Sequence, residues 1–331
     1  MDRKSFIKTS LWTSLLAFTG ISVSAITNND DKKIDKKKPK KDGLRGVEMV
    51  CSPTNTHMVG NGFKVMNFYP NGKGFEERMS PFFLLDFNAE VNFPPSDIAH
   101  GVGVHPHRGI ETITFAYKGA VAHHDSAGNS GVINPGDVQW MTAGGGVLHK
   151  EYHEQTFNQK GGAFEMLQLW INLPKAHKMT PAKYQGITHT DKPKVELPDG
   201  QGTVFVVAGE FNGVSGIATT FSPVHLYDMH LKKDAKVSFE LPENFNSGLL
   251  VVDGDIEVNG NKVPENHYVQ LANEKGAIEI KVNRNALVMV LSGEPLNEPY
   301  VSYGPFVMNT EDEIREAIED YKAGKFGFLA D

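Results

Sequence analysis

The chain has 331 residues, of which 40% are hydrophobic and 22% are charged. These values exclude a fibrous or wholly disordered protein, and the length predicts two domains of about 100–150 residues each. A single cysteine, Cys51, excludes an intramolecular disulfide, a thiolate zinc cluster and a cysteine-ligated iron–sulfur cluster, so any metal must be held by histidine and carboxylate side chains.

Residues 1–25 have the pattern of a signal peptide. Arg3, Lys4 and Lys8 precede an apolar stretch that ends in small residues at Ala25. We expect cleavage after Ala25 and export to the periplasm, with no membrane span in the mature form; an uncleaved anchor helix is the alternative. The basic start also resembles a twin-arginine export signal, with Lys4 in place of the second arginine, so the export route stays open.

Residues 26–43 are too polar and too charged to bury a core, and we predict a disordered charged linker there. The linker is rich in lysine, but the rest of the chain does not suit a nucleic-acid partner. Residues 1–43 hold 10 of the 33 basic and 5 of the 40 acidic residues, which leaves a net charge of −12 on residues 44–331. Such an acidic body repels polyanions, so no nucleic-acid partner is expected.

From Leu44 to about Pro174, short β-type runs alternate with turns rich in Gly, Pro, Asn and Asp. Many short strands at this spacing are typical of a β-sandwich or a β-barrel. We therefore predict an N-terminal β-barrel domain over residues 44–190. The β-type runs with their turns include residues 63–68, 111–117, 131–137 and 165–171.

A second set of β-type runs follows a polar connector at about 175–200 and predicts a C-terminal domain over 191–331. These runs are residues 203–208, 224–231, 248–252, 255–258 and 286–291. Residues 309–318 have a capping residue, early acids and the spacing of an amphipathic helix, which we expect to close the domain. A β run, a glycine turn and another β run occur both at 117–121 and at 252–256, which hints at duplication. The predicted fold class is all-β.

The strongest candidate site is a metal centre built from two pairs of residues spaced two apart. Positions i and i+2 of a strand face the same side, so His105 and His107 can direct two imidazoles at one point. His149 and Glu151 can do the same from a neighbouring strand. Three neutral imidazoles and one carboxylate suit one divalent first-row metal ion and leave coordination positions open. Pro106 indicates an edge strand or a strand end.

Two other residues compete with members of this set. Glu111 has the same strand parity as His107 and is a rival for the carboxylate ligand, and His153 is a rival if the segment after His149 is helical. We rank both below Glu151. The remaining histidines that we considered have no such companion, so we expect solvated or core roles for them and a metal-free C-terminal domain: His123, His124, His225 and His230.

Four segments of the chain resemble sequences of the pirin family. They are HPHRGIETIT at 105–114, NPGDVQWMTAGGGVLHKE at 134–151, GEPLNEP at 293–299 and GPFVMNT at 304–310. Within the second segment, Gly144–Gly146 is not followed by the Lys-Ser/Thr of a phosphate loop, and predicts instead a tight backbone approach to the site. The similarity runs from about residue 44 to the end of the chain.

The resemblance implies a bicupin, in which two jelly-roll β-barrels lie face to face and the N-terminal barrel holds a single iron. The iron ligands of the family fall on His105, His107, His149 and Glu151. The donor set alone also accepts manganese, nickel, copper or zinc. Nothing in the sequence resembles an apolar association helix, so a monomer is the expectation.

The resemblance also leads to two hypotheses of function. The first is an oxidoreductase similar to quercetin 2,3-dioxygenase, which uses O2 to cleave the heterocycle of a flavonol-like aromatic substrate with loss of carbon monoxide. Glu151 is then the catalytic residue that accepts the proton of the substrate hydroxyl. The second is a non-catalytic redox sensor or regulatory binding protein, in which the oxidation state of the metal alters the surface near the barrel mouth.

Overall fold

The computed structural model describes residues 43–53, 56–69 and 78–330. The predicted signal peptide (1–25) and the predicted linker (26–43), except for its last residue, lie outside the described residues. Among the helices in the described part of the chain, none has the length and apolarity needed to cross a membrane. Strands dominate, and the described α-helices are α3 (Gln155–Lys160) and α4 (Glu311–Lys322).

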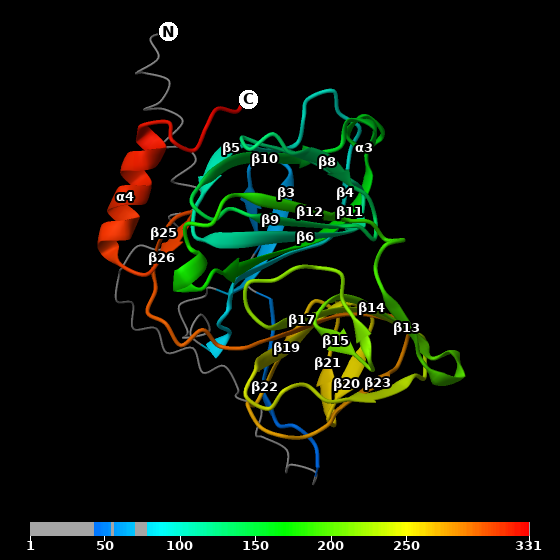
Figure 1. The fold of residues 1–331 in the computed structure, drawn as a ribbon. Helices are drawn as coiled ribbons and strands as arrows, with labels where there is room; N and C mark the ends of the chain where they lie inside the picture. The colour runs from blue at the N-terminus through cyan, green and yellow to red at the C-terminus, as the bar shows by residue number, and fades with distance from the viewer. Residues whose placement is uncertain (1–42, 54–55, 70–77, 331) are drawn as a thin grey trace, which may run out of the picture.

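The N-terminal barrel consists of a seven-stranded and a four-stranded sheet that face each other (Figure 1). The strands of the large sheet, in spatial order, are β12 (Lys183–Ile187), β9 (Val138–Thr142), β6 (Ile110–Lys118), β11 (Gly162–Asn172), β4 (Phe82–Phe93), β3 (Phe63–Tyr69) and β2 (His57–Val59). The strands of the small sheet are β5 (Gly101–His107), β10 (Val147–His153), β7 (Val121–Asp125) and β8 (Ser130–Ile133).

The C-terminal barrel repeats this arrangement. Its large sheet contains β1 (Val47–Cys51), β22 (Tyr268–Leu271), β19 (Asn246–Asp253), β24 (Ala286–Gly293), β17 (Val224–Leu231), β14 (Gly202–Ala208) and β13 (Lys194–Glu196). Its small sheet contains β18 (Lys236–Phe239), β23 (Ile278–Val282), β20 (Ile256–Val258) and β21 (Asn261–Val263). The short pairs β15 (Glu210–Phe211) with β16 (Val214–Ser215) and β25 (Val301–Tyr303) with β26 (Phe306–Met308) lie outside these sheets, as do the 3-10 turns Lys175–His177 and Pro198–Gly200. The predicted all-β fold with two jelly-roll domains is confirmed.

The two large sheets pack against each other, and one apolar core fills the space between them. This core contains Ile113 and Phe115 of β6 together with Leu226 of β17 and Leu250 of β19. Successive side chains of a strand point to opposite faces, so Thr114 of β6 points away from this core and into the N-terminal barrel. Both faces of β6 are therefore buried, which explains its almost continuous run of buried residues.

The internal similarity suggested by the sequence corresponds to an equivalent turn in each barrel. Gly119 follows β6 and leads into β7, and Gly254 follows β19 and leads into β20. At both places the chain passes from the large sheet of a barrel to its small sheet. Both glycines have positive φ, 72° and 97°, a conformation that favours glycine. The two turns thus have equivalent positions in the two barrels.

The segment at 175–200, predicted to be a polar connector, contributes a strand to each barrel. β12 pairs with β9 at the edge of one large sheet, and β13 pairs with β14 at the edge of the other. Edge strands are bonded on one side only and need no continuous apolar pattern, which explains the lack of a strand signal in the sequence of this segment.

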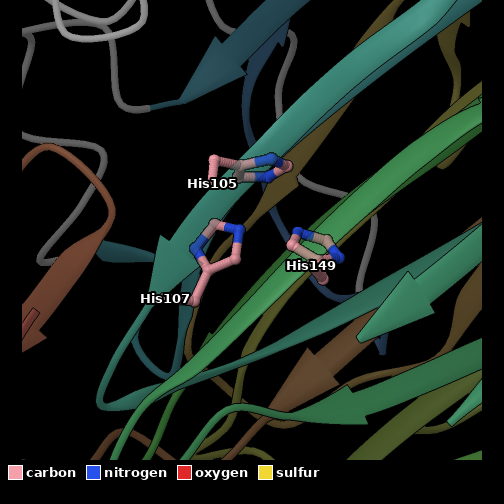
Figure 2. Close-up of side chains that lie close together, drawn as sticks. All are labelled: His105, His107 and His149. Atoms are coloured by element: carbon pink, nitrogen blue, oxygen red, sulfur yellow. The ribbon is translucent and has the colours of Figure 1, made fainter. Parts of the chain in front are cut away.

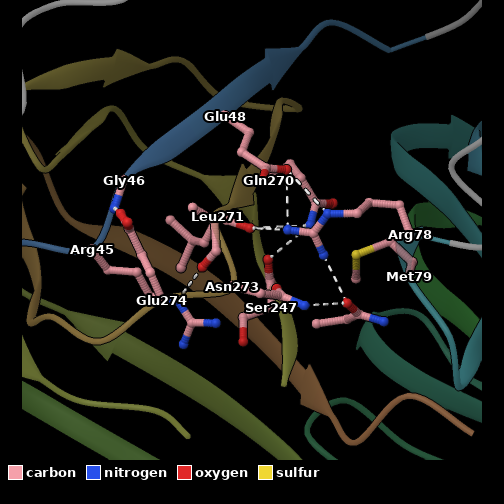
Figure 3. A network of polar contacts seen from close by, with 12 residues as sticks. Arg45, Gly46, Glu48, Arg78, Met79, Ser247, Gln270, Leu271, Asn273 and Glu274 are labelled. Atoms are coloured by element: carbon pink, nitrogen blue, oxygen red, sulfur yellow. Dashed lines mark hydrogen bonds and ion pairs between the residues drawn. The ribbon is translucent and has the colours of Figure 1, made fainter. Parts of the chain in front are cut away.

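The N-terminal end of the described chain belongs to the C-terminal barrel, because β1 pairs with β22. Arg45 is completely buried, and its guanidinium donates to the carbonyl oxygens of Ala272 (2.6 Å) and Phe245 (2.7 Å). Arg78 donates to the carbonyl oxygen of Leu271 (2.6 Å), and the ion pair of Arg78 with Glu48 measures 3.0 Å (Figure 3). These contacts attach the N-terminal end of the described chain, and the segment at Arg78, to the C-terminal barrel.

The C-terminal end of the described chain packs against the N-terminal barrel (Figure 1). β26 is joined to the residue after β5 by a bridge between Phe306 and Arg108. The predicted helix at 309–318 is present as α4, and its capping box joins Thr310 and Glu313. β1 therefore lies in the C-terminal barrel, and the last residues of the described chain pack on the N-terminal barrel.

Candidate metal centre

The two histidine-bearing strands are neighbours in the small sheet of the N-terminal barrel. β10 pairs with β5 so that His149 lies opposite His105 and Val147 lies opposite His107. β5 is the edge strand of this sheet, which confirms the location indicated by Pro106. A proline removes a backbone donor, and an edge strand tolerates this loss because one of its sides has no partner.

The structure brings three of the predicted ligands together (Figure 2). One potential ligand atom from each of His105, His107 and His149 lies within 4.8 Å of the others. The ring centroids are 4.2 Å apart for His105 and His149, 4.7 Å for His107 and His149, and 5.0 Å for His105 and His107. Three imidazoles at this spacing can hold one metal ion between them.

Several ring nitrogens of the cluster have no hydrogen-bond partner among the described residues. They are Nδ1 of His107 and both nitrogens of His149, and all are buried. Nδ1 of His105 lies 2.8 Å from the carbonyl oxygen of Gly103, so Nε2 is the nitrogen available to a metal. Buried polar atoms are normally bonded, so converging unpartnered nitrogens fit a metal ion.

Burial keeps these histidines in the neutral form that binds metals. Burial lowers the pKa of His105 to about 4, and it lowers the pKa values of His107 and His149 well below the usual value of 6.5. The nearby backbone carbonyl of Pro305 offsets part of the lowering of the His107 pKa. All three rings therefore offer a free lone pair at neutral pH.

Glu151 lies two residues after His149 on β10, but the pairing with β5 is irregular between these two positions. Glu151 lies opposite Val102, so β5 contains one extra residue there, as in a β-bulge. Thr114 Oγ1 donates to its Oε1 (3.3 Å), and Gln168 Nε2 donates to its Oε2 (2.9 Å). Burial raises its pKa. Its role as the fourth ligand stays a prediction.

The two rivals of Glu151 and His149 lie elsewhere. Glu111 is on β6, and its Oε1 accepts hydrogen bonds from Trp140 Nε1 (2.9 Å) and Thr142 Oγ1 (2.7 Å). Trp140 belongs to the core between the barrels, so Glu111 faces away from the metal centre. Strand parity with His107 does not persist, because the chain turns at Gly109 between β5 and β6.

His153 continues the inward face of β10, which is a strand and not a helix. Its Nε2 lies 2.9 Å from the carbonyl oxygen of Gly62, and its ring packs against Phe93 and Phe164. His123 is also completely buried and lies opposite Glu151 on β7, with its Nε2 2.7 Å from the hydroxyl of Tyr184. These hydrogen bonds and ring contacts of His153 and His123 stabilise the interior of the N-terminal barrel. Neither residue is part of the cluster of three histidines.

The predicted close approach of the backbone at Gly144–Gly146 is present, but the neighbours are Thr180 and Phe326 and not the metal-binding residues. A Cβ on Gly144 would lie 2.0 Å from the carbonyl oxygen of Thr180, and a Cβ on Gly146 would lie 2.4 Å from the ring of Phe326. These glycines therefore let residues 179–180 and the C-terminal end of the chain pack behind the strands that carry the histidines.

Sequence reasoning missed the opposite wall of the site. Asp86 of β4 and Gln168 of β11 are register partners and line the same cavity as His105 and His107. Asn67 Nδ2 donates to Asp86 Oδ1 (2.6 Å), and burial raises the pKa of Asp86 to about 7. Isolated polar residues in apolar runs are a weak signal, and only the pairing of distant strands places these two beside each other.

The cavity at this site measures about 30 Å³, which is room for roughly one or two water molecules. Its polar lining is His105, His107, Glu151, Asp86, Asn88 and Gln168, and its apolar lining is Val59, Phe63, Val65, Leu84, Val102, Met166 and Trp170. An apolar cavity with a few convergent polar groups is typical of a ligand site.

Comparisons with known proteins agree with this fold. Residues 62–171 match the family model described as Pirin, and residues 226–327 match the model described as Pirin C-terminal cupin domain. A protein of Pseudomonas aeruginosa, named provisionally as a quercetin 2,3-dioxygenase, is 44% identical over 284 residues, which cover 86% of this chain and 99% of that protein. Pirin of Mus musculus is 37% identical over 230 residues, which cover 68% of this chain and 77% of that protein.

A solved structure gives the same result. The crystal structure titled quercetin 2,3-dioxygenase from Acinetobacter baumannii has a TM-score of 0.83 and 44% sequence identity, and the match covers 87% of this chain and 100% of that one. The resemblance to pirins seen in the sequence is confirmed, and the chain belongs to the pirin family.

Proposed function

We propose that the protein is a metal-dependent dioxygenase that cleaves a flavonol-like aromatic substrate with O2. The observation that carries the proposal is the convergence of three neutral imidazoles beside a mainly apolar cavity, which His105 and His107 line, with unpartnered nitrogens on His107 and His149. Glu151 lines the same cavity and is the proposed fourth ligand. Relatives named as quercetin 2,3-dioxygenases favour this substrate class, and the family resemblance favours iron as the metal.

In this proposal a bound metal supplies positive charge that lowers the pKa of a substrate hydroxyl. Glu151 accepts the hydroxyl proton, because its carboxylate lines the same cavity as His105 and His107. Gln168 and Thr114 hold the two oxygens of Glu151 while the proton moves. The apolar walls, which include Trp170, exclude water from the reacting carbons.

The size of the cavity sets a further requirement for this function. Pockets for drug-sized ligands measure about 300 Å³ or more, whereas this cavity measures about 30 Å³. A flavonol therefore enters only if part of the wall moves. The wall formed by Val59, Phe63 and Val65 belongs to β2 and β3 at the edge of the large sheet, where the fewest backbone bonds oppose such a movement.

The test is metal content and oxygen consumption with quercetin, measured on the same samples of the protein and two variants. His149→Ala should lose both metal and oxygen consumption. His124→Ala is the matched control, because His124 lies on the neighbouring strand β7, is bonded to Tyr152 and is outside the cluster. Bound metal with no oxygen consumption on flavonols would favour the sensing or regulatory hypothesis. Equal metal content in His149→Ala and the unaltered protein would disprove the site.

We further propose that the protein is exported to the periplasm after cleavage behind Ala25. The support is the basic start, the apolar stretch and the small residues of the N-terminal sequence. The first residue of the protein isolated from periplasmic extract should be Ile26. A mature protein that begins at Met1 and stays with the membrane would favour the anchor helix instead.

A further inference from the structure

The two strands that carry the histidines also contact the C-terminal end of the chain through their other face. Successive side chains of a strand point to opposite sides. His107 and His149 point into the barrel, and the residues adjacent to them, Arg108, Leu148 and Lys150, contact residues 305–330. We call residues 305–330 the brace.

The contacts beside His107 centre on Arg108, which is 3% exposed. Its Nη2 donates to Asp320 Oδ2 of α4 (2.8 Å), and its Nε donates to the carbonyl oxygen of Gly145 (2.7 Å). Its guanidinium also lies over the ring of Phe326, 4.8 Å from the ring centroid. A buried arginine with this many bonded donors has one orientation, and it fixes the end of β5 next to His107.

The contacts beside His149 involve Ser126. Its hydroxyl accepts a hydrogen bond from the backbone N–H of Leu148 (3.0 Å) and donates to the carbonyl oxygen of Phe326 (2.5 Å). The side chain of Leu148 packs against the apolar cluster that the brace forms around Phe306 and Phe326. Lys150 Nζ donates to the carbonyl oxygen of Ala330 (2.8 Å). Both neighbours of His149 are thus held by the brace.

Two further contacts join the brace to the turn that follows His107. The buried ammonium of Lys178 donates to the carbonyl oxygens of Gly109 (2.8 Å) and Val307 (2.6 Å), and to the side chain of Asn172. The backbone carbonyl of Pro305, in the brace, also accepts a hydrogen bond from the backbone N–H of Arg108, the residue after His107 (3.4 Å). These contacts hold the backbone that directly follows His107.

We propose that the brace positions His107 and His149, so that docking of the C-terminal segment and metal binding reinforce each other. The inference rests on the proposed metal centre, but not on any catalytic activity. Coupling of two sites is reciprocal: a docked brace raises the affinity for metal, and bound metal holds the brace in place. Asp320 and Phe326 act as positioning residues, because they reach the centre only through Arg108 and Ser126.

The first test is the affinity of the full-length protein for Zn²⁺, measured by competition with a chelating dye. Asp320→Ala should weaken binding roughly tenfold or more, the effect typical of losing a group that orients a ligand. Arg315→Ala is the matched control, because Arg315 is exposed on the same helix and pairs only with Glu311 and Asp312 among the described residues. Asp320→Asn keeps an acceptor for Arg108 and should fall between the two. Unchanged affinity in folded Asp320→Ala would overturn the proposal.

The second test uses the unaltered protein, and it tests the coupling between the brace and metal binding even if Asp320→Ala does not fold. Addition of Zn²⁺ should slow amide hydrogen exchange in α4 severalfold, since bound metal favours the docked brace. The same addition to His149→Ala should leave the exchange in α4 unchanged. Equal exchange with and without Zn²⁺ in a protein that binds the metal would contradict the coupling. Neither test measures turnover, so a protein that is not a dioxygenase can still pass both.

Discussion

The residues of the metal centre differ in how burial affects their charge. Burial favours the neutral imidazole in His105, His107 and His149, which is the form that binds a metal. Burial also favours the neutral form of Glu151, which is the wrong form for a ligand. A cation beside Glu151 reverses this preference, because an opposite charge stabilises the carboxylate. The carboxylate is therefore the residue whose chemistry depends most on the metal.

Replacement of Glu151 by glutamine tests its role as the proton acceptor. Glutamine keeps the shape and one oxygen, so the protein should still bind metal through the three histidines, although more weakly. Oxygen consumption with quercetin should fall by roughly 100-fold, the usual contribution of a positioned base. Glu90→Gln, on the exposed part of β4, is the control and should change neither quantity. Unchanged turnover in Glu151→Gln would remove Glu151 from the mechanism.

Glu111 is a second buried carboxylate, and its effect is on stability. Burial raises its pKa from 4.5 to about 7, against the opposing effect of hydrogen bonds from Thr142 and Trp140. The folded protein therefore binds more protons than the unfolded chain between pH 4.5 and 7. The contribution of this group to the free energy of unfolding is fully present below pH 4.5 and is lost as the pH rises through 7.

Glu111→Gln should consequently gain stability relative to the unaltered protein as the pH rises. The gain between pH 5 and pH 8 has an upper limit of about 3 kcal/mol, since each unit of pKa corresponds to about 1.4 kcal/mol. Thermal unfolding of both proteins across this range measures it. Glu319→Gln, an exposed position on α4, should show no such trend. A difference between Glu111→Gln and the unaltered protein that does not vary with pH would show that the carboxyl is not perturbed.

At the scale of the element, the predictable part of the site lies within single strands. The spacing of His105 with His107 follows from the period of a strand, and Pro106 indicated an edge. Glu111 has the strand parity of His107 only if both residues share one strand, and the turn at Gly109 separates them. Asp86 was missed because its place beside the site depends on the pairing of β4 with β11, which are far apart in sequence.

The helix α4 is the element of the brace whose stability can be altered without touching the barrel. Thr310 accepts a hydrogen bond from the backbone of Glu313 (3.2 Å), and Glu313 accepts one from the backbone of Thr310 (2.8 Å). Thr310→Ala should cost about 1 kcal/mol of helix stability and raise hydrogen exchange in α4. Thr310→Ser keeps the hydroxyl and should retain most of the stability. Equal exchange in the alanine and serine variants would show that the cap does not hold the helix.

At the scale of the molecule, each end of the described chain packs with the barrel that is formed mainly by the other half of the chain. β1 completes the large sheet of the C-terminal barrel, and α4 packs on the N-terminal barrel. The sequence predicted two β domains correctly but not this packing of the ends, because the pairing of Val47 with Leu271 joins residues more than 200 positions apart. Local patterns predict which residues form strands, whereas such distant pairings depend on the packing of the whole chain.

The packing of the ends and the shared core predict that the two barrels unfold together. Leu250 of β19 is fully buried in the core between the large sheets, where residues of both barrels contribute. Leu250→Ala should lower the free energy of unfolding by about 2–5 kcal/mol. Although Leu250 belongs to the C-terminal barrel, calorimetry of the zinc-loaded protein should show one transition that moves to lower temperature as a whole.

The metal centre lies in the other barrel, so release of Zn²⁺ provides an independent signal for that half of the molecule. In Leu250→Ala, metal release on heating should move to lower temperature together with the calorimetric transition, because the N-terminal barrel loses the sheet that packs against its own large sheet. Two resolved transitions, with metal release following the one that does not move, would mean that each barrel is stable alone. The brace would then have to act on the metal centre locally, through Arg108 and Ser126, and not through the stability of the whole fold.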